Sequence, residues 1–244
     1  MLKMLGLAAA ASAVLVGAGY HSMAPRSQLY GRTFIGHPGT RQIALTYDDG
    51  PNDPFTLKLL DVLSRYNVKA TFFLIGKYVD QRPDIARELI AQGHVVGNHT
   101  YTHPNLIFRN TRQVKEEIAR CDRSLRDAVG DACAPLFRPP FGGRRPATLR
   151  TVRAAGLSPV MWSVTGYDWN AKSTDAIERT VAPRIRGGDV ILLHDGGHLE
   201  FGTDRSFTVQ ATERLISRFH DEGYEFVTIS QMYNSASQLS ASIV

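Results

Sequence analysis

The amino-acid sequence predicts an α/β protein in which about seven parallel strands form a barrel. Short apolar runs of strand length alternate with longer segments whose apolar residues recur at helical spacing. The connections are short, and strands that alternate with helices are typical of parallel sheets. About seven such units in one chain favour a barrel. An open doubly wound sheet is the alternative, but the chain lacks the Gly-x-Gly-x-x-Gly turn that would favour it.

Strands are expected where short apolar runs end at polar or turn-forming residues. They span residues 42–48, 69–76, 94–98, 136–139, 158–164, 189–193 and 224–229. Helices are expected where apolar residues return every three or four positions, as Leu59, Leu60 and Leu63 do. They span residues 54–66, 83–92, 111–129, 146–155, 173–186 and 208–222. Pro146 suits a first helical turn, and Gly187 suits a helix end.

The composition is that of an ordinary globular protein. At 244 residues the chain is long enough to bury a substantial core. The net charge is +5, and the basic residues are scattered rather than gathered into one dense patch. This distribution argues against nucleic-acid binding. We expect no nucleic-acid partner, and we expect a monomer.

The first residues have the pattern of an export leader. Lys3 precedes an uncharged, Ala-rich apolar run from Leu5 to Ala18. This run has the length of a signal-peptide core and is short for a membrane span, which needs about 20 residues. We therefore expect a secreted, periplasmic or cell-envelope protein. Its leader is either cleaved or retained as an N-terminal membrane anchor.

The chain has two cysteines, Cys121 and Cys133. An exported protein is free to form a disulfide. Cys121, however, lies on the apolar stripe of the helix expected at 111–129, together with Ile118 and Leu125. This position favours a buried free thiol.

Two adjacent carboxylates, Asp48 and Asp49, end the first expected strand. Neighbouring side chains of a regular strand point to opposite faces, so the two acids cannot both face one site inside a strand. Gly50 and Pro51 follow directly, and both residues favour a turn. At such a strand end the two acids can converge on one point and serve different purposes. An ordinary Asp-Gly-Pro turn is the alternative interpretation.

Other chemically active residues also follow predicted strands. They are His99 and His103 after the third strand, Arg138 after the fourth, Asp168 and Trp169 after the fifth, and His194 after the sixth. Barrel enzymes assemble their active sites at the carboxyl ends of the strands. The repeated placement at one end therefore predicts a catalytic site there. His198 follows Gly196 and Gly197, and it is a further candidate for lining the cleft.

His99 and His103 have a spacing that suits two ligands of one metal ion if the segment makes a helical turn. With Asp49 they form a set of two imidazoles and one carboxylate that leaves coordination positions open. Such a set is typical of catalytic zinc, and it also occurs in iron(II) oxygenases. The ligand set alone does not decide between these metals.

Five motifs occur in one order along the chain. They are Thr-Tyr-Asp-Asp-Gly-Pro (46–51), His-Thr-Tyr-Thr-His (99–103), Arg-Pro-Pro-Phe-Gly (138–142), Asp-Trp (168–169) and Leu-Leu-His (192–194). Together they resemble the motifs of the polysaccharide deacetylase family, the NodB-homology domains of carbohydrate esterase family four. The resemblance covers roughly residues 40 to 232. It implies a distorted (β/α) barrel and metal-dependent hydrolysis of N-acetyl or O-acetyl groups on a polysaccharide such as peptidoglycan or chitin-type oligomers.

The resemblance also implies roles for individual residues. Asp49, His99 and His103 would hold one divalent metal ion, zinc first, with cobalt, nickel or iron as alternatives. Asp48 would be the general base that acts on a metal-bound water, and Arg138 would pair with it.

The remaining roles concern the substrate. The backbone N–H of Phe141 would stabilise the oxyanion, and His194, held by Asp168, would protonate the leaving amine. Trp169, Leu192, Pro139 and Pro140 would line the substrate pocket.

The resemblance has one departure and leaves one alternative. The family often has an acidic residue where this chain has Thr165, which affects the finer arrangement of that loop. The alternative function is a catalytically inert carbohydrate-binding domain on the same fold. The predicted organisation is a leader or anchor (1–24), a connector (25–40), a NodB-homology deacetylase domain (41–233) and a C-terminal tail (234–244).

Overall fold

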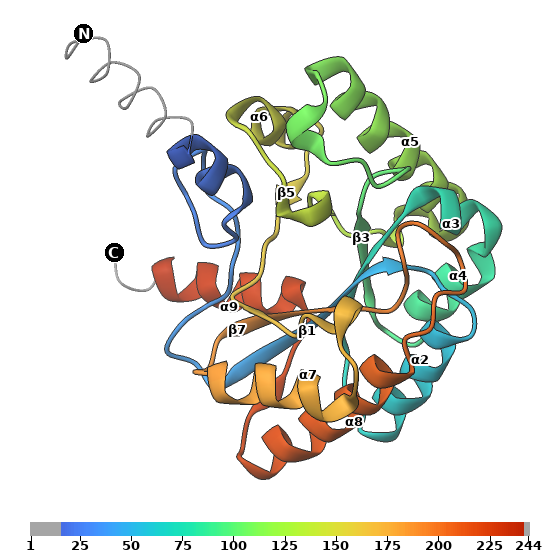
Figure 1. Cartoon of the computed structure of the whole chain (residues 1–244), viewed down its shortest axis with the longest axis vertical. Coiled ribbons are helices and arrows are strands. Elements are labelled where there is room, and N and C mark those ends of the chain that lie inside the picture. Colours follow the sequence, from blue (N-terminus) through green and yellow to red (C-terminus); the bar gives the residue numbers. More distant parts are fainter. Residues whose placement is uncertain (1–15, 242–244) are drawn as a thin grey trace, which may run out of the picture.

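The structure is a computed structural model that describes residues 16–241. The leader predicted for residues 1–24 lies mostly outside the described residues, and its described end is helical over residues 16–23. The chain then runs down one side of the molecule as an extended segment (Figure 1). No helix within residues 16–241 combines the length and the apolar character that crossing a membrane requires.

A curled parallel sheet forms the centre of the molecule, with helices packed around it (Figure 1). Its strands lie in the order β5 (Ser158–Pro159), β4 (Leu136–Phe137), β3 (Val95–Asn98), β2 (Thr71–Leu74), β1 (Gln42–Gly50), β7 (Asp189–His194) and β6 (Val164–Thr165). The short strand β8 (Glu225–Phe226) also pairs with β1. All of these pairings are parallel. The predicted α/β class and distorted barrel are therefore confirmed.

One predicted strand is wrong in an informative way. The segment expected as a single strand at 158–164 is divided into β5 and β6, which stand at opposite ends of the sheet order. The barrel is thus open between these two strands. Phe34 covers part of the opening: its N–H donates to Pro159, and its carbonyl accepts the N–H of Met161. A distant piece of chain supplies this pairing, so local sequence patterns do not predict it.

Most of the helices cover the outside of the sheet, and α9 (Ile229–Ala241) packs against its inner face. The outer helices are α2 (Phe55–Arg65), α3 (Gly76–Gln81), α4 (Pro83–Ala91), α5 (Thr111–Val129), α6 (Pro146–Ala154), α7 (Thr174–Val181) and α8 (Ser206–Asp221). The sequence analysis missed α3 and α9. Helix α3 begins at Gly76, the last residue of an expected strand, and α9 begins at Ile229 and continues into the residues predicted as a tail. At both places the apolar residues of an expected strand run up to the start of the helix, so the sequence pattern does not indicate where the helix begins.

The two faces of β1 explain how the sheet carries both a core and a site. Ile43, Leu45 and Tyr47 pack outward, in the large core shared with α2 and α8. Ala44 points inward, into a smaller core that includes Met232 of α9. Because side chains alternate along a strand, Asp48 shares the inner face with Ala44. The interior of the barrel is therefore apolar at one end and acidic at the other.

The two cysteines are free. Cys121 of α5 is fully buried in the large core, and burial raises the pKa of its thiol. The prediction of a buried free thiol at Cys121 is confirmed.

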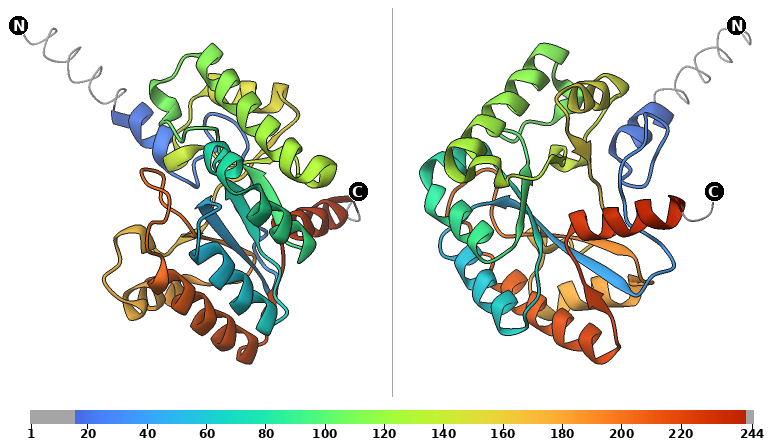
Figure 2. Two further views of the ribbon diagram at one scale, coloured as in Figure 1. Left: turned by 90° about the vertical axis from the view of Figure 1, so that its right-hand side faces the viewer. Right: turned by 180° about the vertical axis from the view of Figure 1, so that it is seen from behind.

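Residues 20–37, which we call the N-terminal strap, lie along the opening of the barrel next to α9 (Figure 2). The ring of Phe34 lies 5.2 Å from the ring of Tyr233 in α9. At the far end of the strap, the His37 N–H donates to the Gly188 carbonyl, at 2.8 Å. Gly188 has a φ of +74°, and a Cβ there would collide with the His37 carbonyl oxygen.

This close approach predicts that Gly188→Ala is much more destabilising than a matched glycine substitution. Gly39→Ala is the control, because Gly39 also has a positive φ, +88°, but open space around its Cα. The control should lose about 1 kcal/mol from backbone strain alone. Gly188→Ala should lose at least about 2 kcal/mol more, because the strap must move. Urea unfolding measures both, and equal losses would contradict the prediction.

Candidate active site

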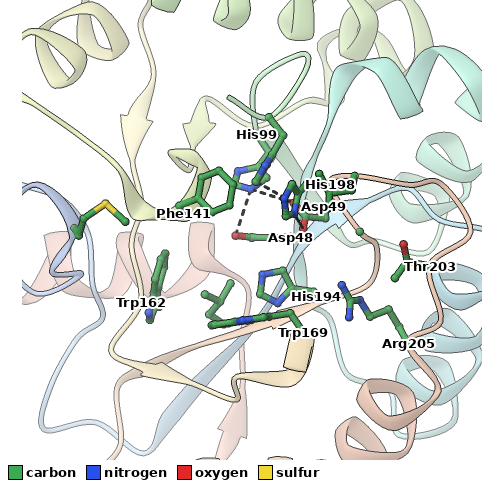
Figure 3. Close-up of a pocket in the computed structure, with 15 residues that line it drawn as sticks. Asp48, Asp49, His99, Phe141, Trp162, Trp169, His194, His198, Thr203 and Arg205 are labelled. Atoms are coloured by element: carbon green, nitrogen blue, oxygen red, sulfur yellow. Dashed lines mark ion pairs between the residues drawn. The ribbon is translucent and has the colours of Figure 1, made fainter. Parts of the chain in front are cut away.

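A cavity of about 530 Å³ opens at the carboxyl ends of the strands. Asp48 and Asp49 of β1, His99 after β3 and His194 at the end of β7 all line it, as Figure 3 shows. His103 and Phe141 lie on its wall. The structure thus brings together the residues that the sequence places after separate strands.

The two acids converge because β1 contains a bulge. Asp48 pairs with Phe73 of β2 but Gly50 pairs with the next residue, Leu74, so Asp49 is an extra residue. Asp49 has a φ of +74°, which turns its side chain out of the strand alternation. A turn after the strand was expected to do this, yet β1 continues through Gly50.

The two histidines converge without a helix. The helical turn on which the spacing argument depended is not formed, because Thr100 and His103 have positive φ values of 68° and 61°. Hydrogen bonds hold this loop: the side chain of Thr100 accepts the His103 N–H, at 3.1 Å. Glu117 of α5 accepts the N–H groups of Tyr101 and Thr102, at 3.0 and 2.8 Å. The loop is therefore fixed from both inside and outside.

Asp49, His99 and His103 have the geometry of a metal site. One ligand atom from each lies within 4.8 Å of the others, and all three side chains are buried. Asp49 Oδ1 lies 3.6 Å from His99 Nε2 and 3.2 Å from His103 Nε2, and it has no hydrogen-bond partner. A buried carboxylate oxygen without a donor, facing two imidazole nitrogens, fits a cation between them.

The protonation states also suit a cation. His99 Nδ1 lies 2.7 Å from the carbonyl of Arg138, and as the donor of this bond it leaves Nε2 unprotonated. Burial lowers the pKa of His103 well below its ordinary value, which favours the neutral, ligating form. Burial also raises the pKa of Asp49, although the neighbouring histidines oppose this rise. A bound cation would stabilise the ionised carboxylate.

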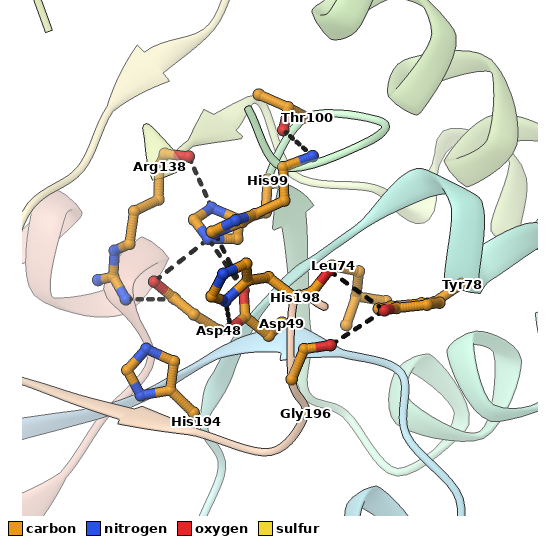
Figure 4. A network of polar contacts seen from close by, with 12 residues as sticks. Asp48, Asp49, Leu74, Tyr78, His99, Thr100, Arg138, His194, Gly196 and His198 are labelled. Carbon is orange, nitrogen blue, oxygen red and sulfur yellow. Dashed lines mark hydrogen bonds and ion pairs between the residues drawn. The ribbon is translucent and has the colours of Figure 1, made fainter. Parts of the chain in front are cut away.

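Asp48 is held outside this triad by Arg138 (Figure 4). The fully buried guanidinium of Arg138 donates to Asp48 Oδ1 at 2.7 Å and to Thr46 Oγ1 at 2.8 Å. Burial lowers the pKa of Arg138, and the charge of Asp48 partly offsets this effect. The second oxygen, Asp48 Oδ2, lies 3.6 Å from His99 Nε2. One Asp48 oxygen is therefore fixed while the other points to the metal ligands.

His194 and Asp168 form a second charged pair across the cavity. His194 Nδ1 lies 2.9 Å from Asp168 Oδ1. Asp168 Oδ2 accepts hydrogen bonds from the backbone N–H of His194 and from the Thr208 hydroxyl. Burial disfavours the imidazolium, but the Asp168 charge and hydrogen bond, with the charges of Asp49 and Asp48, raise the pKa of His194 to about 9. The remaining nitrogen, Nε2, is left for a substrate.

Apolar side chains complete the cavity. Trp169 and Leu192 line it, and the Trp169 ring stands edge-on to His194 at 5.1 Å. Phe141 has a φ of +57° in the turn Pro140–Gly142, and its ring contacts His103. Pro139 and Pro140 do not line the cavity, contrary to expectation. They are buried and shape the turn that presents Phe141.

Further residues reach the cavity, and of these the sequence analysis pointed only to His198. His198 Nδ1 lies 3.8 Å from Asp49 Oδ2, and its ring lies 4.6 Å from that of His103. Met23, Trp162 and Arg205 also line the cavity. His198 follows the same strand end as His194, which was a usable signal. Met23 and Trp162 gave none, because they come from the predicted leader and from the middle of a predicted strand.

Comparisons with known proteins agree with one another. The family model described as polysaccharide deacetylase matches residues 36–160. A chitooligosaccharide deacetylase of Sinorhizobium fredii is 42% identical over 198 residues, which cover 79% of this chain and 92% of that protein. A peptidoglycan-N-acetylglucosamine deacetylase of Bacillus cereus is 37% identical over 212 residues, which cover 86% of this chain and 74% of that protein.

A solved structure has the same architecture. It is the crystal structure of a peptidoglycan N-acetylglucosamine deacetylase in complex with 4-naphthalen-1-yl-N-oxidanyl-benzamide. It superimposes with a TM-score of 0.76 at 36% sequence identity, and the match covers 82% of this chain and 91% of that chain. The likeness therefore extends to both sequence and fold.

The geometry predicts that the adjacent acids differ in metal binding. Asp49→Asn removes the anionic member of the triad, so metal affinity should fall at least about 10-fold. In metal sites generally, the loss of a residue that only hydrogen-bonds to a ligand already costs about this much. Asp48→Asn is the matched control and should keep near wild-type affinity, because Arg138 holds Asp48 aside. Competition with a chromophoric chelator measures both variants. Equal loss of affinity would show that the two acids share one role.

Proposed function

Because this chain belongs to the polysaccharide deacetylase family, we propose that it hydrolyses acetyl groups on the amino-sugar units of an extracellular or cell-envelope polysaccharide. Peptidoglycan and chitin-type oligomers are the two substrate types, and the names of the relatives support both. The observation that carries the proposal is one cavity lined by a potential metal triad, a carboxylate held by arginine and a histidine held by aspartate. Such a cavity holds every group that amide hydrolysis needs.

Asp49, His99 and His103 would bind one divalent ion, and we favour zinc, with cobalt, nickel or iron as alternatives. When bound, such an ion would polarise the acetyl carbonyl and make water a better nucleophile at neutral pH. The protein's own contribution is the rigid loop that holds both histidines and the bulge that presents Asp49.

Asp48 acts as the general base. It accepts a proton from the water that attacks the acetyl carbonyl carbon, and the Arg138 guanidinium at 2.7 Å keeps the carboxylate oriented. The backbone N–H of Phe141 donates to the oxyanion that forms.

His194 acts as the general acid. Its Nε2–H donates a proton to the amide nitrogen as the carbon–nitrogen bond breaks, so acetate and a free amine leave. Asp168 holds the ring through Nδ1 and favours the protonated state. Trp169 and Leu192 receive the acetyl methyl group. The reaction class is hydrolysis of a carbon–nitrogen bond other than a peptide bond.

Export places the enzyme next to these polymers. We propose that the apolar run before residue 20 directs the chain out of the cytoplasm, either as a cleaved leader or as a retained anchor.

Acetate release from three polymers tests the function. The purified protein loaded with zinc should release acetate from peptidoglycan or chitin oligomers, and more slowly from acetylated xylan, which carries esters on sugars without amino groups. Metal removal by a chelator should abolish release, and re-addition should restore it. Binding of oligosaccharide without acetate release would indicate an inert carbohydrate-binding domain. Metal-dependent oxygen consumption would indicate an oxygenase.

The variant His194→Ser distinguishes loss of the general acid from loss of the metal ion. Amide deacetylation should fall about 10²- to 10⁴-fold, the range typical of a lost general acid. An aryl acetate ester should suffer less, because phenolate leaves without a proton. Metal content should stay near wild type. His220→Ser, on the exposed surface of α8, is the matched control.

The pH profile gives the same experiment a second readout. His194 must be protonated to act, so the amide rate should fall as pH rises through the pKa of His194. This pKa should lie between the ordinary 6.5 and about 9, because a bound cation would offset part of the effect of the nearby acids. His194→Ser should lose this alkaline limb. Equal losses on amide and ester, or a limb that persists in the variant, would contradict the role.

A further inference from the structure

We propose that the N-terminal strap is part of the substrate cleft, where Met23 and Trp162 bind a sugar unit next to the one that loses its acetyl group. The inference rests on the proposed function and extends it to the shape of the substrate. It also gives Arg144 a positioning role, because this residue holds the strap in place.

The cavity is larger than its chemistry requires. Its volume of about 530 Å³ is in the range of sites for drug-sized ligands, whereas an acetyl group has only three heavy atoms. In Figure 3, Trp162 and Arg205 lie on opposite sides of Asp48 and His194. The cavity therefore continues past the reacting centre in both directions, as a cleft for a polymer must.

Met23 and Trp162 give one side of this cleft the character of a sugar site. Met23 is 40% exposed and lines the cavity, although it precedes the first catalytic residue by 25 positions. Trp162 is partly buried in the inner core and also lines the cavity. A pyranose ring has an apolar face of C–H groups, and such faces pack on large apolar and aromatic side chains.

The strap and the catalytic turn are built to touch. Gly142 follows Phe141, and a Cβ on Gly142 would lie 3.0 Å from the Trp162 ring and 3.6 Å from the Met23 carbonyl oxygen. Gly142 also has a φ of +69°. Glycine therefore lets Met23, Trp162 and the turn that carries Phe141 pack closely around one end of the cavity.

Arg144 fastens this arrangement. It is 1% exposed, and its guanidinium donates to the carbonyls of Ala24, Ser27 and Gly142 at 2.7, 2.8 and 2.9 Å. Its own N–H donates to the Ser22 carbonyl at 3.0 Å. The side chain and backbone of one buried residue thus join the strap, on both sides of Met23, to the turn of Phe141.

This clamp looks specific rather than incidental. No carboxylate among residues 16–241 forms an ion pair with Arg144. A buried charge without a counterion is costly, and backbone carbonyls arranged around it compensate. The planar guanidinium presents five N–H donors in a fixed geometry, whereas an ammonium group has three. The position of the strap is therefore determined by the fold.

The strap overlaps the predicted export leader. Ser22 and Met23 fall within the segment that the sequence assigns to the leader, residues 1–24. If Met23 binds substrate, the mature enzyme retains these residues. N-terminal sequencing of active, exported protein should therefore find a first residue before Ser22. An active mature chain that begins after Met23 would overturn the inference.

Met23→Ala in the full chain tests the site directly. The KM for N-acetylchitotetraose should rise about 10-fold, the low end of what a lost hydrophobic contact costs in a pocket, with kcat within about twofold. The rate on a small aryl acetate ester should fall by a smaller factor, because this substrate has no neighbouring sugar unit. Leu29→Ala is the matched control, because Leu29 is on the same strap, is 67% exposed and does not line the cavity. Equal kinetics in the two variants would overturn the inference.

A binding assay keeps the inference independent of catalysis. The chain has two tryptophans, Trp162 and Trp169, so Trp169→Phe leaves Trp162 as the single fluorophore. Its emission should change on titration with N-acetylchitotetraose, and adding Met23→Ala should weaken the Kd about 10-fold. No emission change at saturation would overturn the inference. Met23-dependent binding without acetate release from any polymer would support it and refute the proposed hydrolysis instead.

Arg144→Lys tests the clamp. The charge stays but the set of carbonyl bonds is lost, so the KM for the oligosaccharide should rise as in Met23→Ala, and the oligosaccharide rate should fall by a larger factor than the ester rate. Arg145→Lys is the control at the neighbouring position. A loss of ester and oligosaccharide rates in equal proportion would show that Arg144 supports only the fold.

Discussion

The buried contact between Arg138 and Asp48 is the interaction on which the rest of the site depends. Arg138 is fully buried, and its guanidinium reaches Asp48 and Thr46 on the inner face of β1. It also donates to the Met161 carbonyl, in the segment that crosses the open side of the barrel. Its own carbonyl lies 2.7 Å from His99 Nδ1. One side chain and its backbone therefore connect Asp48, a potential metal ligand and the barrel opening. Substitution of only one partner should be strongly destabilising, because it leaves an uncompensated buried charge.

Backbone strain gathers around this contact. The described residues include six non-glycine positions with positive φ: Asp49, Asn67, Thr100, His103, Phe141 and Tyr167. All but Asn67 belong to the site or lie directly beside one of its residues. Such conformations persist only where the surrounding structure determines them, here the rigid parallel sheet and the bonds from Glu117 to the histidine loop. The strain aims side chains that regular strands and helices would point elsewhere.

Hydrogen bonds also tie the strap, in the N-terminal part of the chain, to the barrel and the site. Phe34 supplies backbone pairing at the barrel opening, and Arg144 binds the strap to the turn of Phe141. Export and substrate binding would then share one stretch of sequence, because the residues that follow the apolar run also border the cavity.

The sequence alone determined the α/β class, the parallel strands and the buried thiol of Cys121. It also determined the motifs at the carboxyl ends of β1, β3 and β7. These features depend on local periodicity and on residue type, which a chain displays directly. Tertiary structure decided the rest. The bulge at Asp49, the non-helical path from His99 to His103 and the division of 158–164 into β5 and β6 arise from pairing with distant strands. Met23 and Trp162 reach the cavity only because Arg144 and the open barrel bring them there. No local pattern encodes such contacts, since each depends on partners far away in the sequence.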